Sequence, residues 1–234
     1  MTSPIILAVD TPSLETAKRW IDATRESIDV YKLGLEFYLT FGSEGVSQIQ
    51  REFGVDIFLD LKLHDIPNTV SSAAKAISHL SPRFLTVHAS GGTEMIASAA
   101  KAVPGVDITA VTILTSLSEE DLFSIGFANP ALESAVALAR LAVDAGAKAI
   151  VCSPLEIEAI RGVVGDEINI ITPGVRPQSS GGSDDQVRTM TPSKAISAGS
   201  NFLVIGRPIT GKWSEGASAM SDAARSILEE INNS

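Results

Sequence analysis

The sequence predicts a single domain over residues 1–234, built as a closed (β/α)8 barrel of the TIM type. Two observations predict it. Eight short runs rich in Ile, Val and Leu recur along the chain, and a helix-like stretch follows each of them. With 234 residues and 44% hydrophobic content, the chain also has the size of one large core. The doubly wound open sheet shares this alternation and is the rival fold, and two small domains are a further alternative.

Each expected strand is a short apolar run of the kind that parallel sheets contain, because helices cover both faces of such sheets. The third run, FLDLKLHD, is the exception, since charged residues interrupt it. In chain order the strands are expected at 5–9, 30–33, 57–63, 84–88, 108–113, 149–152, 168–172 and 202–206.

The expected helices are supported by residues that favour helix ends. Ser13 and Pro154 stand at the first turn of two helices, and two others end at Gly146 and Gly199. In chain order the helices are expected at 13–26, 44–53, 68–79, 92–102, 131–145, 154–161, 192–198 and 215–231.

The composition argues against some binding partners and some cellular locations. A net charge of -10 leaves no basic surplus to neutralise a phosphate backbone, so nucleic acid is a poor candidate partner. The only cysteine, Cys152, excludes an internal disulfide and fits a reducing compartment such as the cytoplasm. The N-terminal MTSPIILAVDTP has no basic region and only a short apolar run, so we expect neither export nor a membrane span.

The charged third strand indicates the site. Alternation along a strand places Phe58, Asp60 and Lys62 on one face and the leucines on the other, which suits the helix layer. Asp60 and Lys62 are therefore expected in the barrel mouth, where barrel enzymes keep their catalytic residues. An ion pair on a solvated edge is the alternative, but central parallel strands are normally apolar on both faces. His64 shares this face at the rim and has no assigned role.

Neighbouring strands add further charge. Lys32 lies within the apolar second strand, and Asp10 follows the first. Four ionisable groups of both signs are thus expected at adjacent strand ends, where each stabilises the charged form of its neighbours. His88 and Cys152 are interpreted as core or hydrogen-bonded packing positions.

Asp65 does not fit this pattern. It falls on the opposite phase, beyond the strand end and just before Pro67, which can begin the next helix. An outward carboxylate beside the mouth is well placed to enter the site of a symmetry-related subunit. Surface capping of the helix is the alternative.

A phosphate site is expected at the loops after the last two strands. Thr172-Pro173-Gly174 and Gly206-Arg207 lie there, and barrels often bind phosphate in this region. Arg207 can make a forked contact with phosphate. The Ser/Gly-rich loop PQSSGGSDDQ at 177–186 lies between them, and we expect residues 176–186 to close over the phosphate as a lid. A solvated flexible loop is the alternative.

These residues resemble the orotidine 5'-phosphate decarboxylase family. FLDLKLHDIPNTV at 58–70 closely resembles its signature, Asp-x-Lys-x-x-Asp followed by Ile-Pro-x-Thr. The resemblance covers the whole chain. Other matching stretches are LAVD at 7–10, YKLGLEF at 31–37, TVHASGG at 86–92, AVTILTS at 110–116, TPGVRP at 172–177, DQVRTMTP at 185–192 and VIGRPIT at 204–210.

The resemblance implies decarboxylation of orotidine 5'-phosphate to uridine 5'-phosphate (UMP) and CO2, the last step of de novo pyrimidine nucleotide synthesis, by a homodimer. Lys62 would be the proton donor, and Asp60 would lie against the substrate carboxylate. Lys32 and the partner subunit's Asp65 would complete an alternating charge array. The other implied contacts are Asp10 together with Lys32 at the ribose hydroxyls, the partner subunit's Thr69 on the ribose side, Ile66 near the departing carboxylate, Thr115 at the pyrimidine, and Gln186, Gly206 and Arg207 at the phosphate, with Arg176 supporting that region.

The reaction needs no cofactor on this interpretation. Decarboxylation at C6 leaves an electron pair in the ring plane, orthogonal to the π system, so an ammonium group must stabilise it. Two alternatives remain. A Mg²⁺-dependent sugar-phosphate decarboxylase or synthase of the same suprafamily would carry a metal-binding glutamate where this chain has Lys32. A catalytically silent nucleotide-binding barrel would lack the complete charge array.

Overall fold

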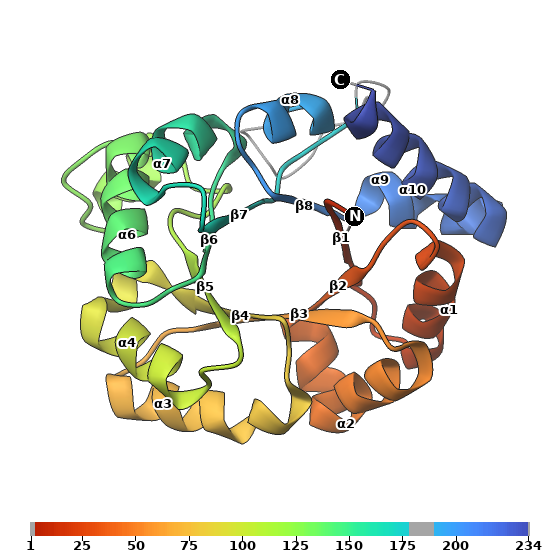
Figure 1. The fold of residues 1–234 in the computed structure, drawn as a ribbon, viewed down its shortest axis with the longest axis horizontal. Helices are drawn as coiled ribbons and strands as arrows, with labels where there is room; N and C mark the ends of the chain where they lie inside the picture. The colour runs from red at the N-terminus through yellow and green to blue at the C-terminus, as the bar shows by residue number, and fades with distance from the viewer. Residues whose placement is uncertain (1–2, 178–189, 234) are drawn as a thin grey trace.

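Eight parallel strands close into one barrel in the computed structural model, which describes residues 3–177 and 190–233. The strands follow one another in chain order, and the last pairs with the first (Figure 1). The predicted closed barrel is therefore confirmed over the open sheet. The strands are β1 (Ile5–Ala8), β2 (Val30–Gly34), β3 (Asp56–Leu63), β4 (Phe84–His88), β5 (Asp107–Val111), β6 (Ala149–Val151), β7 (Asn169–Thr172) and β8 (Phe202–Ile205).

Helices form a ring outside the barrel (Figure 1). None of those in the described part of the chain combines the length and the apolar character that a membrane crossing needs. The α-helices are α1 (Leu14–Thr24), α2 (Leu35–Phe53), α3 (Pro67–Ala76), α4 (Thr93–Ala102), α5 (Glu119–Ser124), α6 (Ala131–Asp144), α7 (Ile157–Val164), α8 (Pro192–Ser197), α9 (Arg207–Thr210) and α10 (Ala217–Asn232). The 3-10 turns are η1 (Ser78–Leu80), η2 (Ala89–Gly91), η3 (Pro154–Glu156) and η4 (Gly211–Glu215).

The expected helix ends are present. Ser13 caps α1 by accepting a hydrogen bond from the Thr16 backbone N–H at 3.2 Å, and Ser153 caps η3 in the same way. Gly146 follows α6 with a φ of 99°, a left-handed conformation that favours glycine. These local signals explain why the predicted boundaries of these helices lie within a few residues of the observed ones.

Three helical segments differ from the prediction. The second helix, expected at 44–53, already begins at Leu35, and Gly42 (φ 60°, ψ -162°) breaks it into two pieces. Neither α5 nor α9 is predicted by the sequence pattern. Both are too short for a helical repeat of apolar residues to be recognised.

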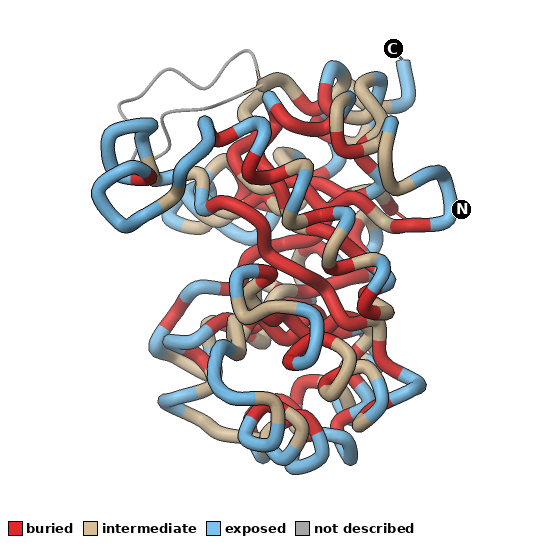
Figure 2. Tube along the Cα trace, turned by 90° about the vertical axis from the view of Figure 1, so that its left-hand side faces the viewer, coloured by how far each residue is buried: buried red, intermediate tan, exposed pale blue. Residues whose placement is uncertain are grey.

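Two apolar layers hold the barrel together. The larger lies between the strands and the surrounding helices, and the smaller fills the barrel interior. Figure 2 shows the buried residues gathered in the middle of the molecule and the exposed ones in the outer loops and helices. Because opposite faces of each strand supply the two layers, both form from one alternating pattern. The interior layer consists of Ile6, Val30, Phe58, Phe84, Ala149, Ile171 and Phe202.

The N-terminal end of the barrel is sealed. The guanidinium of Arg83 lies 5.1 Å from the ring centroid of Phe84 and 5.0 Å from that of Phe202, and Nη1 pairs with Asp56 at 3.2 Å. Such a cation over two aromatic faces covers the apolar interior while keeping its charge near water. The open end of the barrel is therefore the C-terminal one.

Candidate active site

The third strand bulges where it carries its charged residues. Between two regular pairs of β3 and β4, the three residues from Asp60 to Lys62 lie opposite the single residue Thr86. Lys62 adopts a φ of 49°, which is uncommon for a residue other than glycine. Leu61 and Leu63 pack against the helix-side core, as alternation predicts. Alternation therefore gives the correct faces but does not predict the bulge.

The charged side chains meet at the barrel mouth. Lys62 Nζ lies 2.8 Å and 2.9 Å from the two carboxylate oxygens of Asp60. Lys32 Nζ lies 3.6 Å from Asp60 Oδ2 and 3.0 Å from Asp10 Oδ1. The four groups predicted to converge do so, in the spatial order Asp10, Lys32, Asp60, Lys62.

Asp60 is the most enclosed of the four, since it is only 8% exposed. Burial by itself would raise the pKa of Asp60. The charges of Lys32 and Lys62, together with hydrogen bonds from Lys62 and Thr86, outweigh this, and the net shift of the Asp60 pKa is downward. The carboxylate is thus held ionised between two ammonium groups at a buried position.

Gly34, at the end of β2, leaves room for this arrangement. A Cβ atom at that position would lie 3.2 Å from Lys32 Nζ and 3.4 Å from Asp10 Oδ1. Any larger residue would therefore press on the outer ion pair. Asp10 is the exposed member of that pair and faces the rim of the mouth.

Two adjoining hollows open beside the charges, and they share Lys32, Pro173 and Val204 as common walls. The inner hollow, of about 190 Å³, adds Phe58, Asp60, Lys62, Val111, Ile113, Leu114, Thr115, Val151 and Cys152. The outer hollow, of about 320 Å³, adds Ala8, Asp10, Arg176, Gly206, Arg207 and Thr210. An apolar slot with charges at one end thus continues into a second space that carries two arginines.

The structure brings together most residues predicted for the site. Thr115 lines the inner hollow, and Arg176, Gly206 and Arg207 line the outer one. Gln186 lies outside the described residues, as does most of the expected lid.

The outward residues lie apart from both hollows. Asp65, Ile66 and Thr69 are exposed, and Ile66 is 65% exposed although it is apolar. Asp65 Oδ1 accepts a hydrogen bond from the Ile66 N–H at 2.6 Å. No side chain caps α3, because Ile66 stands at its N-cap position. The helix-capping alternative for Asp65 is therefore wrong, and its inter-subunit role stays a prediction.

Sequence reasoning missed Thr86. This residue is fully buried on β4, and its hydroxyl bonds both to the backbone of Lys62 and to the carboxylate of Asp60. A hydroxyl in the middle of the buried run FLTVH, on the strand next to the charged one, is the signal that could have found it.

Cys152 is buried as expected, and burial raises the pKa of its thiol.

The two rim histidines lie side by side. The ring centroids of His64 and His88 are 5.3 Å apart, and His88 is half-buried at the end of β4. Burial is the main cause that lowers the pKa of His88, and the nearby His64 and Lys62 act in the same direction. His88 is thus a packed histidine next to the charged site.

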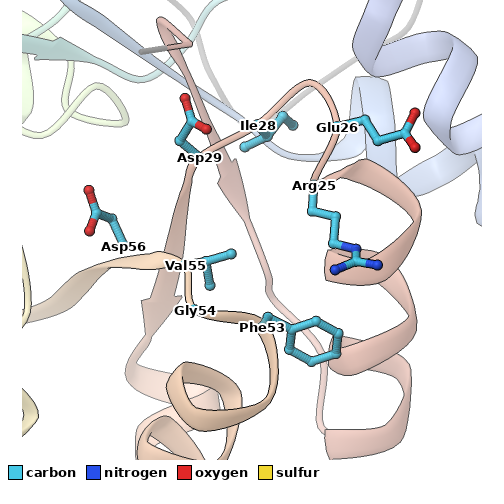
Figure 3. A pocket seen from close by; sticks show the side chains of 8 residues that line it. All are labelled: Arg25, Glu26, Ile28, Asp29, Phe53, Gly54, Val55 and Asp56. Carbon is cyan, nitrogen blue, oxygen red and sulfur yellow. The ribbon is translucent and has the colours of Figure 1, made fainter.

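A larger hollow, of about 810 Å³, lies outside the barrel interior, where it is lined by residues of the segments that lead into β2 and β3. Figure 3 shows the carboxylates of Glu26, Asp29 and Asp56 pointing in different directions around it. Asp29 accepts a hydrogen bond from the Ser3 N–H at 2.7 Å, and Asp56 pairs with Arg83. Because its polar groups do not converge, this hollow lacks the arrangement that a binding site needs.

The fold and the site define a (β/α)8-barrel enzyme with a lysine–aspartate centre at the C-terminal ends of its strands. Residues 3–221 match the family described as "Orotidine 5'-phosphate decarboxylase / HUMPS family". The chain belongs to this family.

Named relatives agree over nearly the full length. The chain is 47% identical to an orotidine 5'-phosphate decarboxylase of Thermobifida fusca, over 96% of each chain. It is 43% identical to the enzyme of that name in Gluconobacter oxydans, over 97% of this chain and 96% of the relative. The crystal structure of orotidine 5'-phosphate decarboxylase from Lactobacillus acidophilus superposes with a TM-score of 0.84 at 34% identity, covering 98% and 99% of the two chains.

Proposed function

We propose that this chain decarboxylates orotidine 5'-phosphate to UMP and CO2, the last step of de novo pyrimidine nucleotide synthesis. Family membership and relatives of that name at 40–47% identity support the activity. The observation that carries it is the contact of Lys62 Nζ with both oxygens of Asp60, beside an apolar slot. The proposed compartment is the cytoplasm, because a single cysteine forms no internal disulfide and fits a reducing environment.

The two hollows fit the two ends of such a substrate. The phosphate would occupy the outer hollow, where Arg176 and Arg207 supply the positive charge that an anion requires. The pyrimidine would enter the inner hollow beside Thr115 and its apolar walls. Asp10 and Lys32 would bind the ribose hydroxyls, since Lys32 lines both spaces and pairs with Asp10 at the wall of the outer one. Contacts from Gln186 and a lid over 176–186 remain part of the proposal.

The chemistry follows from the charges. When the bond between C6 and the carboxylate breaks, CO2 leaves and the electron pair stays on C6 in the ring plane. The ammonium of Lys62 stabilises this pair and then transfers its proton to C6, which gives UMP. The Asp60 carboxylate lies against the substrate carboxylate, so their repulsion is relieved as CO2 departs. Lys32 keeps Asp60 ionised at the start of each turnover.

A magnesium-dependent sugar-phosphate enzyme is the other candidate within this family. Lys32 argues against it, because its ammonium group is 3.6 Å from Asp60 Oδ2 and would repel a divalent cation bound there. The complete charge cluster likewise argues against a silent nucleotide-binding barrel. The cofactor-free reaction is therefore the one that these residues favour.

The decisive experiment follows orotidine 5'-phosphate by ultraviolet absorbance in excess EDTA. Wild type should convert it to UMP, and Lys62→Ala should lower kcat by about 10⁴-fold, since it removes both the stabilising charge and the proton donor. Lys148→Ala, an exposed lysine just before β6, is the matched control and should keep full activity. Conversion that requires added Mg²⁺, or that survives in Lys62→Ala, would overturn the proposal.

The active form is further proposed to be a homodimer in which Asp65 and Thr69 reach the partner's site. Both side chains are exposed at the edge of the mouth, next to the exposed apolar Ile66. Mixing Lys62→Ala and Asp65→Ala chains should restore roughly a quarter of the sites by random pairing. No recovery, with subunit exchange verified by native mass spectrometry, would contradict the shared site.

A further inference from the structure

Thr86 connects the two central residues of the site through one hydroxyl group. Its Oγ1 accepts a hydrogen bond from the Lys62 backbone N–H at 2.8 Å and donates one to Asp60 Oδ1 at 3.0 Å. Thr86 is also the single β4 residue opposite the three-residue bulge of β3. The side chain thus bonds to the backbone where the regular ladder is interrupted.

The directions of these two hydrogen bonds are fixed by chemistry. A backbone N–H can only donate, so the Thr86 oxygen must accept from Lys62. The one proton of the hydroxyl is then left for Asp60, and an ionised carboxylate can only accept it. Thr86 therefore favours both the bulged backbone at Lys62 and the ionised form of Asp60.

We propose that Thr86 is a positioning residue of this site, whose hydroxyl holds the Lys62 backbone and the Asp60 carboxylate in one fixed relation. Lys62 is held at a φ of 49°, which is unfavourable for a residue with a side chain. Without the hydroxyl, the Lys62 backbone N–H loses this acceptor, and Asp60 Oδ1 keeps only its bond from the mobile Lys62 ammonium among the contacts of the described residues. The lysine then samples other positions relative to the substrate C6, and the reacting geometry is lost for part of the time.

Three other titratable groups face Asp60. Lys32 faces it from β2, Lys62 from β3 and His88 from the end of β4. Thr86→Val keeps all three groups in the chain, so a change in the titration of Asp60 reports the loss of the Thr86 hydroxyl, through its own hydrogen bond and through the Lys62 position that it fixes. Removing the hydroxyl should raise the pKa of Asp60, because a hydrogen bond to the ionised form lowers the pKa.

Three variants test the proposal. Thr86→Val keeps the shape and removes the hydroxyl, whereas Thr86→Ser keeps the hydroxyl and removes the methyl group. Thr109→Val is the matched control, because Thr109 is the register partner of Thr86 on β5, is equally buried, and donates its hydroxyl to the backbone oxygen of Asp107 rather than to a charged group. Thermal unfolding of each variant shows that it is folded.

The kinetic readout rests on the proposed decarboxylase function. Thr86→Val should lower kcat by about 10- to 100-fold, the range expected for losing a hydrogen bond to a charged group. Its affinity for UMP should be unchanged, and the acid limb of its pH profile should move to higher pH. Thr86→Ser should recover most of kcat, and Thr109→Val should match wild type.

A second readout does not depend on activity. The carboxyl ¹³C signal of Asp60, assigned with Asp60→Asn, should titrate at higher pH in Thr86→Val than in wild type or Thr86→Ser. Equal titration in all three proteins would overturn the proposal, as would a Thr86→Val enzyme with the kcat of wild type or a Thr86→Ser enzyme as impaired as Thr86→Val. If wild type proves inactive on orotidine 5'-phosphate, the proposed function fails and the titration alone decides the role of Thr86.

Discussion

Charged side chains occupy different surroundings at the two ends of the barrel. At the N-terminal end, Arg83 covers two aromatic rings and pairs with the partly exposed Asp56, so its charge sits on a packed apolar interior. At the C-terminal end, Lys62 and Asp60 occupy inward positions where apolar side chains would otherwise pack, and the lysine backbone is held in a left-handed conformation. The first arrangement contributes stability, whereas the second gives up stability to place reactive groups. Substitutions at the N-terminal end should therefore lower stability and spare activity, whereas substitutions at the C-terminal end should lower activity and spare stability.

The largest expected effect on stability is at the sealed end. Phe84→Ala removes a fully buried ring that contacts Phe58 and Phe202, with centroids 5.7 Å and 5.6 Å apart. The cavity left behind should lower the free energy of unfolding by about 3–5 kcal/mol, measured by urea denaturation. The kcat of the folded fraction should stay close to wild type. Phe123→Ala, at an exposed phenylalanine of α5, is the control and should be nearly neutral. A large loss of kcat in Phe84→Ala would mean that the two ends are not separable.

At the mouth we expect the reverse, a large loss of activity with little loss of stability. Arg207→Ala removes a cation from the outer hollow, so kcat/KM for orotidine 5'-phosphate should fall by about 100-fold as the phosphate contact is lost. The free energy of unfolding should change by less than about 0.5 kcal/mol. Lys212→Ala, which removes a nearby exposed cation paired with Glu215, is the matched control for charge. An unchanged KM and kcat in Arg207→Ala would exclude the outer hollow as the phosphate site.

A smaller effect is expected for the cation that seals the barrel. Arg83→Ala should lower the free energy of unfolding by about 1–2 kcal/mol, because it loses both ring contacts and the covering side chain. Arg25→Ala removes an exposed i,i+3 pair with Asp22 at the same end and should be neutral within about 0.5 kcal/mol. If both variants are equally stable, the stacking of Arg83 on the rings contributes nothing.

The contrast between the ends also explains what the sequence could predict. The repeat of eight strand–helix units predicts the barrel, and strand alternation predicts that Asp60 and Lys62 point inward. Both predictions depend only on local periodicity. The convergence of Asp10 and Lys32 follows from the parallel order of the strands. The bulge at Lys62 and its contact with Thr86 could not be predicted, since both depend on the register of β3 against β4.

The second helix and the outward residues show two further limits. The start of α2 at Leu35 was missed because Gly42 interrupts its helical geometry and breaks the pattern. Asp65 and Thr69 are exposed within one chain, so a role in a second subunit cannot be read from the geometry of a single barrel. Local patterns thus predict elements, whereas bulges, kinks and assembly depend on contacts between distant parts of the structure.

The smallest expected change in stability concerns the backbone of Lys62, and it tests most directly whether the mouth gives up stability. Lys62 has a φ of 49°, where glycine is favoured over alanine by about 1 kcal/mol, whereas at an ordinary strand position alanine is favoured by about 0.5–1 kcal/mol. Lys62→Gly should therefore unfold at higher urea than Lys62→Ala, although both lose the same ammonium group and are equally inactive. Asp56→Gly and Asp56→Ala, in the same strand but without a positive φ, should show the opposite order. If Lys62→Ala proves at least as stable as Lys62→Gly, Lys62 stores no backbone strain, and the view that the mouth gives up stability for reactive placement loses its main support.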